Sequence, residues 1–170
     1  MKRFRISPGS VWYRAMVPRW SHLPLSGAGA AHKGSRFNRP GLETLYLADT
    51  PMTALAEFLQ DSPMLGPVVL ASYVVGPVEV ADLTGEQPVD DPWRDWRAPW
   101  RLIANIQKTT PPSWACGDAA LAARLDGIRY PSTRREGGTA LALYTGDIAP
   151  DKLAVYDPDG SLPKTALSWR

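Results

Sequence analysis

Residues 44–58 read TLYLADTPMTALAEF and carry the clearest local-structure signals in the chain. Residues 44–48 alternate around two leucines, which predicts a strand with Tyr46 on the face opposite those leucines. Thr50 and Pro51 follow, and a threonine N-cap with proline at the first helical position is typical of a helix start. The stretch therefore predicts a strand that leads directly into a helix.

Four apolar residues of that helix have the spacing of a buried stripe: Met52, Leu55, Ala56 and Leu59. Glu57 falls well off this stripe, so we expect its carboxylate to face water or a cleft. Gly66 and Pro67 end the unit.

Strands outnumber helices in the rest of the sequence. Further strands are predicted at residues 11–16, 68–75, 78–83, 127–130, 139–144 and 152–156. Helices are predicted at residues 100–108 and 118–125, the second capped by Gly127, whereas residues 18–40 have the composition of a long irregular loop. Because helices and strands do not alternate regularly, we predict an α+β fold with a mainly antiparallel β core and flanking helices.

The length of 170 residues is sufficient for one cored domain, and no linker divides the chain. We therefore expect residues 1–170 to form a single domain. The tail from about residue 157 contains Pro158, Gly160 and Pro163, so we expect it to be loosely packed until a partner binds.

Composition excludes several classes of protein. A net charge of +2 argues against a nucleic-acid partner, and a single cysteine excludes an internal disulfide and a cysteine-based zinc site. We expect no metal. No apolar run approaches the ~20 residues of a membrane helix, and the N-terminus is not a signal peptide. These features predict a cytoplasmic protein without a membrane partner.

The densest group of polar residues suited to catalysis or binding lies around residues 34–41, which read GSRFNRPG. Arg36, Tyr46 and Glu57 fall on a loop, a strand and a helix, ten and eleven residues apart. A strand–loop–helix unit can bring such positions to one cleft. From the residues alone, a solvated arginine, a packed tyrosine and an exposed helical acid are the more common roles, and the spacing does not overturn them.

Four blocks of sequence resemble the signature of the RES domain family: YRA at 13–15, GSRFNRPG at 34–41, TLYLADTPMTALAEF at 44–58 and RYPS at 129–132. Members are toxins of bacterial type II toxin–antitoxin pairs, named for their Arg, Glu and Ser residues. The blocks occur in the family's order, and the short, arginine-rich chain is similar to ParT-type members. Phe37 stands where many relatives have tryptophan.

The resemblance implies a fold like that of the diphtheria-toxin-like ADP-ribosyltransferases, with NAD as a consumed co-substrate. It implies a catalytic triad of Arg36, Tyr46 and Glu57. The residues it implies for NAD binding are Arg14, Arg36, Asn38, Tyr46 and Ser132.

These residue types suit the cleavage of NAD. A carboxylate such as that of Glu57 would stabilise the positive charge that develops on the ribose as nicotinamide leaves. Tyr46 would stack on the nicotinamide ring, and Arg36 or Arg14 would bind the pyrophosphate bidentately. Ser132 would offer a hydroxyl to the carboxamide or the ribose, without acting as a nucleophile, since no histidine is close in sequence.

The resemblance predicts a toxin that transfers ADP-ribose to a protein target and forms a hetero-oligomer with an antitoxin covering the active site. An NAD hydrolase or phosphorylase with the same donor site is the first alternative, because the acceptor depends on the surrounding loops. A binding module that holds NAD or ADP-ribose without cleaving it is the second alternative. The sequence leaves these open.

Overall fold

A computed structural model describes residues 1–87, 91, 93–146 and 148–169. Its main feature is one eight-stranded sheet with the order β1-β5-β6-β7-β3-β2-β4-β8. The strands are β1 (Arg3–Ile6), β2 (Ser10–Met16), β3 (Thr44–Ala48), β4 (Val69–Val75), β5 (Val78–Asp82), β6 (Gly127–Pro131), β7 (Thr139–Tyr144) and β8 (Leu153–Tyr156). Neighbouring strands are antiparallel except β5 and β6. The α+β fold with a mainly antiparallel sheet is therefore confirmed.

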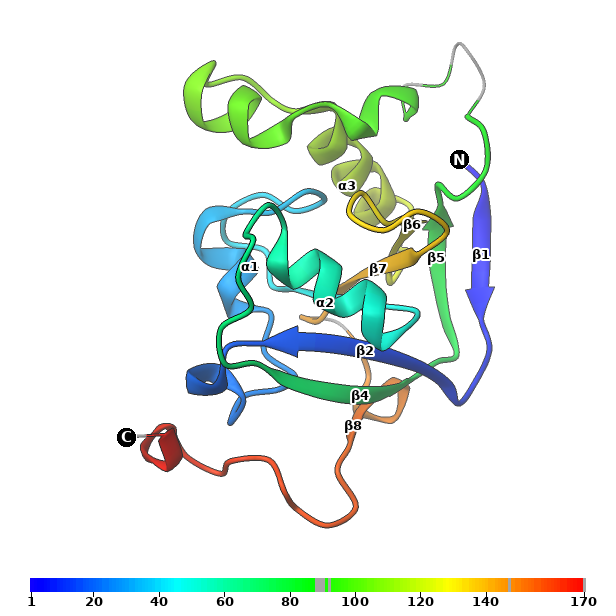
Figure 1. The fold of residues 1–170 in the computed structure, drawn as a ribbon. Helices are drawn as coiled ribbons and strands as arrows, with labels where there is room; N and C mark the ends of the chain where they lie inside the picture. Colours follow the sequence, from blue (N-terminus) through cyan, green and yellow to red (C-terminus); the bar gives the residue numbers. More distant parts are fainter. Residues whose placement is uncertain (88–90, 92, 147, 170) are drawn as a thin grey trace.

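The sheet curls, so that β2 and β4 run across the view while β1 and β5 run up and down it (Figure 1). The α-helices are α1 (Ala28–Lys33), α2 (Pro51–Leu59) and α3 (Pro112–Ala122). Shorter helical turns are η1 (Pro18–Trp20), η2 (Arg94–Arg97), the π-helical η3 (Leu102–Ile106), η4 (Pro150–Lys152) and η5 (Ala166–Trp169). Among the described residues, no helix has the length and apolar character needed to cross a membrane.

Each face of the sheet has its own hydrophobic core. Leu45 and Leu47 of β3 belong to one core, with Trp12, Tyr73, Val75 of β4 and Val78 and Val80 of β5. Phe37, Trp96, Tyr130 and the inner side of α3 form the other core, and Tyr46 packs against it. This alternation along β3 confirms that Tyr46 lies on the face opposite the two leucines.

The start of α2 is as predicted, but its buried face is not. Thr50 is extended and its side chain accepts a hydrogen bond from the Thr53 backbone N–H at 3.1 Å, as an N-cap should. The residues that α2 buries are Thr53 and Ala54, whereas Met52 is 60% exposed. The prediction of an apolar stripe through Met52 was wrong because α2 turns a mixed face with Thr53, Ala54 and Glu57 inward.

Three further local predictions were wrong. Residues 18–40 contain η1 and α1, so they are not irregular throughout. The last long helix begins at Pro112 and not at residue 118. Gly127 does not cap it: Arg124 takes the left-handed conformation after the helix, with a φ of 54°, and Gly127 opens β6. A Cβ on Gly127 would lie 2.0 Å from the carbonyl oxygen of Ala142, so close packing against β7 requires glycine.

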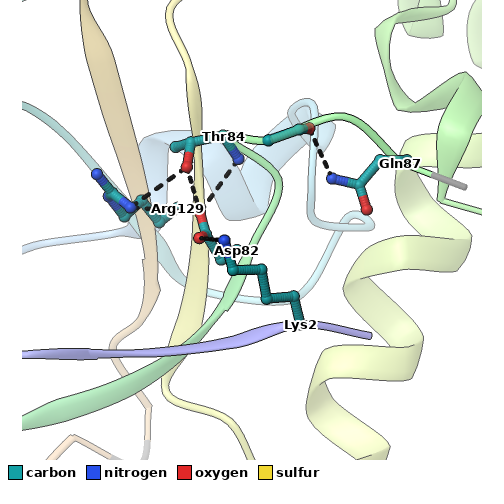
Figure 2. Close-up of polar contacts among 6 residues, drawn as sticks. Lys2, Asp82, Thr84, Gln87 and Arg129 are labelled. Atoms are coloured by element: carbon teal, nitrogen blue, oxygen red, sulfur yellow. Dashed lines mark hydrogen bonds and ion pairs between the residues drawn. The ribbon is translucent and has the colours of Figure 1, made fainter.

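Strand β1, which the sequence analysis missed, is held at the sheet edge by a polar cluster (Figure 2). The Asp82 carboxylate, 2% exposed, lies 3.3 Å from Lys2 Nζ and 3.4 Å from an Arg129 nitrogen. Burial acts to raise the pKa of Asp82, but hydrogen bonds from Thr84, the charge of Arg129 and a hydrogen bond from Lys2 together outweigh it and lower that pKa. The guanidinium of Arg129 also stacks over the Phe4 ring at 4.2 Å. A buried, fully paired carboxylate thus joins β1 to β5 and β6.

Beyond β8 the chain runs along the surface to η5, which lies against η1. The Asp157 carboxylate accepts hydrogen bonds from the backbone N–H groups of Ser161 and Leu162, at 2.7 and 3.0 Å.

Candidate active site

A cavity of about 490 Å³ opens where β2 and β3 separate. Within the described strands, the two pair only at Tyr13 and Ala48, although β2 pairs with β4 along its whole length. The residues exposed by this gap line the cavity, among them Arg14 of β2 and Tyr46 of β3. Helix α2 forms a further wall with Ala54, Glu57 and Phe58.

Glu57 contributes a carboxylate to the cavity wall. Its Oε1 accepts hydrogen bonds from Ser132 Oγ at 2.6 Å and from the Thr133 backbone N–H at 3.1 Å. Among the described residues, Oε2 accepts no hydrogen bond, so this oxygen can face a ligand. The two hydrogen bonds fix the orientation of the carboxylate and leave Oε2 available to a ligand.

Ser132 orients Glu57. Its hydroxyl accepts hydrogen bonds from the backbone N–H groups of Arg134 and Arg135, each at 3.1 Å, and directs its own proton to Glu57. A hydroxyl whose proton is held by a carboxylate, with no histidine beside it, is suited to positioning and not to nucleophilic attack.

Arg36 lies between the cavity and the aromatic core. It donates a hydrogen bond to the Trp96 carbonyl at 3.3 Å, and its guanidinium lies 5.7 Å from the centroid of the Trp96 ring. Burial lowers the pKa of Arg36, while the nearby groups of Tyr130, Glu57 and Tyr46 oppose that shift. Arg36, Tyr46 and Glu57 all line the same cavity. The structure therefore brings the three predicted triad residues together, with the guanidinium of Arg36 half-buried.

Tyr46 presents its ring to the cavity while its hydroxyl is engaged elsewhere. The hydroxyl accepts a hydrogen bond from the Phe37 backbone N–H at 3.0 Å and donates one to Asn38 Oδ1 at 2.9 Å. Burial raises the pKa of Tyr46 to about 12, against the opposing effects of hydrogen bonds from Phe37 and Ser35 and the charge of Arg36. The phenol is therefore neutral at physiological pH.

The remaining predicted NAD-binding residues occupy different positions. Arg14 lies on the cavity wall, and its guanidinium donates to the carbonyl oxygens of Pro24 and Ser26, at 3.0 and 3.2 Å. Ser132 lines an adjoining cavity. Asn38 lies behind Tyr46 with only 1% of its surface exposed.

The cleft is strongly cationic. The main cavity is lined by Arg14, Lys33, Arg36, Arg101 and Arg134, with Glu57 as the carboxylate among its described lining residues. A second cavity of about 540 Å³ shares several of these residues and adds Arg97 and Ser132. Such a lining attracts an anionic ligand and leaves Glu57 as the local negative charge.

The segment around η2 and η3 contributes residues that sequence reasoning missed. Trp100, Arg101 and Asn105 line the main cavity, and the Arg101 guanidinium stacks over the Trp100 ring at 4.8 Å. Nothing in the sequence of this segment indicates which cleft it borders. In the described part of the chain, no three His, Cys, Asp or Glu side chains gather so as to hold a metal ion.

Comparison with known proteins identifies the family. The sequence profile of the RES domain matches residues 11–165, so this chain belongs to the RES domain family. Among solved structures, its fold is similar to that of a chain in the crystal structure of the M. tuberculosis MbcT-MbcA toxin-antitoxin complex, with a TM-score of 0.64 and 22% identity. The alignment covers 90% of this chain and 84% of that one. A search of curated proteins found no match.

Proposed function

We propose that this chain is the toxin of a toxin–antitoxin pair, and that it cleaves NAD at the nicotinamide–ribose bond and transfers the ADP-ribose to a protein. One observation carries the proposal: the carboxylate of Glu57 is held by two hydrogen bonds in a cavity whose other described charged lining residues are all cations. A fold related to the diphtheria-toxin-like ADP-ribosyltransferases is part of the proposal.

The cavity suits both halves of the substrate. Its arginine and lysine side chains offset the two negative charges of the pyrophosphate, and guanidinium groups can bind it bidentately. The face of the Tyr46 ring offers a stacking surface for nicotinamide. These contacts would place the ribose between them, beside Glu57.

In the reaction, the bond between ribose C1′ and the nicotinamide nitrogen breaks, and its electron pair stays on the nitrogen, which becomes neutral. Positive charge develops on C1′ and the ring oxygen, and the fixed negative charge of Glu57 stabilises it. A nucleophilic oxygen or nitrogen of the acceptor then bonds to C1′ and loses its proton. Glu57 or water is the base that accepts it.

A second candidate function is NAD degradation by hydrolysis or phosphorolysis. The observation that favours it is the adjoining cavity, in which Arg36, Arg97, Arg101 and Arg134 gather beside Ser132. An anionic acceptor such as inorganic phosphate would be attracted there. Arg134 already binds a carboxylate, since its guanidinium contacts Asp61 at 2.5 and 3.1 Å.

The proposal includes a cognate antitoxin that covers the cleft. It is supported by the similarity of the fold to a chain from a toxin–antitoxin complex. The cationic lining and the exposed apolar side chains of Leu102 and Ile106 on η3 are suited to a partner with acidic and apolar residues. A cytoplasmic location follows if NAD and the antitoxin are its ligands.

Release of free nicotinamide from NAD tests the proposed reaction. The purified protein is assayed alone, with phosphate and with cell extract, each beside a Glu57→Gln variant. Release that needs extract and labels a protein band supports transfer to protein, whereas rapid release by the protein alone indicates hydrolysis, or phosphorolysis if phosphate is required. Saturable NAD binding without any release would replace the proposal with a binding module.

A further inference from the structure

We propose that Asn38 is a positioning residue, which holds the Tyr46 hydroxyl so that Tyr46 offers a ligand its ring face and not its hydroxyl. This inference rests on the proposed function. It differs from the expectation that Asn38 itself contacts NAD.

The Asn38 side chain is fixed in one orientation. Its Nδ2 lies within hydrogen-bond distance of three backbone carbonyl oxygens: Ala30 at 3.0 Å, Arg39 at 3.0 Å and Leu42 at 3.1 Å. A flipped amide would direct its oxygen at three other oxygens, so this network assigns the orientation. Consequently Oδ1 points to the Tyr46 hydroxyl, 2.9 Å away.

The Tyr46 hydroxyl is fully engaged as a result. Its single proton goes to Asn38 Oδ1, and its oxygen accepts the Phe37 backbone N–H at 3.0 Å. A phenol with its proton and an acceptor site occupied in this way has little capacity left for a substrate. Burial, which raises the pKa of Tyr46 to about 12, keeps it in the neutral form that this arrangement needs.

The backbone segment that receives the Tyr46 hydroxyl is itself rigid. The Phe37 side chain is completely buried, with its ring centroid 4.7 Å from that of Tyr130 and 5.6 Å from that of Trp96. The Phe37 carbonyl accepts a hydrogen bond from the Tyr144 hydroxyl at 3.2 Å. The ring plane of Tyr46 is therefore set by a fixed anchor.

The same segment carries Arg36. Arg36 and Asn38 flank Phe37 in the chain, and the Ser35 N–H donates to the Asn38 carbonyl at 3.0 Å, closing a tight turn around them. Displacing Asn38 would therefore disturb two of the three triad residues, Tyr46 through its hydroxyl and Arg36 through the backbone.

A double-mutant cycle tests the inference, with NAD turnover measured as nicotinamide release for wild type, Asn38→Ala, Tyr46→Phe and the double variant. We expect Asn38→Ala to lower kcat/KM by about tenfold, the value of one neutral hydrogen bond. In the Tyr46→Phe background, Asn38→Ala should lower kcat/KM much less, because the hydroxyl through which Asn38 acts is already absent.

Other results overturn the inference. If Asn38→Ala lowers kcat/KM equally in the wild-type and Tyr46→Phe backgrounds, Asn38 contacts the substrate directly. A lowered Tm with unchanged kcat/KM means that Asn38 is only structural. Val80→Ala is the matched control, since Val80 is fully buried in the core on the opposite face of the sheet and should lower Tm without changing KM.

Failure of the proposed function would give a different pattern. If wild type neither cleaves nor binds NAD, the proposed function is refuted. The same four proteins are then compared by the rate of amide hydrogen exchange at Phe37. We expect Asn38→Ala and Tyr46→Phe each to accelerate exchange there, with little further effect in the double variant. Unchanged protection of the Phe37 amide in Asn38→Ala would refute the positioning role.

Discussion

Replacing Glu57 with glutamine isolates the contribution of one negative charge to the reaction. Glutamine retains a side-chain oxygen that can accept the hydrogen bonds of Ser132 Oγ and the Thr133 N–H, so the local geometry and the Tm should change little. Only the charge is lost. At an effective dielectric constant of about 20, a charge about 4 Å from the developing cation is worth ~4 kcal/mol. A kcat lowered roughly 100- to 1000-fold is therefore expected.

The assay is nicotinamide release at saturating NAD, with the Tm of each variant measured in the same buffer. Glu79→Gln is the control, because Glu79 is an exposed residue of β5 with the same side chain. A folded Glu57→Gln protein that retains activity within about threefold of wild type would refute the electrostatic reasoning, since the expected loss is far larger.

Three further predictions follow from the same geometry. Ser132→Ala removes a hydrogen bond to the carboxylate, so kcat should fall roughly 10- to 100-fold in the same assay, with little change in Tm because the freed N–H groups are exposed. The pKa of Tyr46 is raised to about 12 in the folded protein, so the neutral phenol stabilises the fold fully below about pH 10. As pH rises through 12, up to roughly 3 kcal/mol of the free energy of unfolding is lost. Urea unfolding at pH 8, 10 and 11 should show a smaller loss of stability in Tyr46→Phe than in wild type. Gly117→Ala would place a Cβ 2.3 Å from the Phe37 carbonyl oxygen and should lower stability by roughly 1–3 kcal/mol, whereas the unobstructed Gly29→Ala should not, as thermal unfolding would show.

Local patterns predicted every strand except β1, because each predicted strand lies between clear turn residues and alternates or is continuously apolar. Residues 44–48 and 139–144 match β3 and β7 at both ends. Helix α2 began where Thr50 and Pro51 indicated, but its inward face was missed because Ala54, Glu57 and Phe58 line a cavity. Hydrophobic periodicity identifies a face that packs on a core, and it carries no signal for a face that borders a cleft.

The candidate site was predicted in part for a similar reason. The block around Arg36 and the strand and helix after it are consecutive in sequence, so their resemblance to a known signature could be read directly. Trp100 and Arg101 reach the same cleft although they follow Arg36 by more than sixty residues. Their arrival depends on how Trp96 of η2 packs against Phe37 and Tyr130, which no local pattern encodes.

The single point of pairing between β2 and β3 has a mechanical consequence. It divides the sheet into a five-stranded part, β1-β5-β6-β7-β3, and a three-stranded part, β2-β4-β8, that share few backbone hydrogen bonds. A molecule bound in the cavity contacts both parts, Arg14 in the three-stranded part and Tyr46 in the five-stranded part, and so connects them. Its binding energy then adds to the cohesion of the whole sheet, and an occupied protein should unfold as a stiffer, more cooperative unit than an empty one.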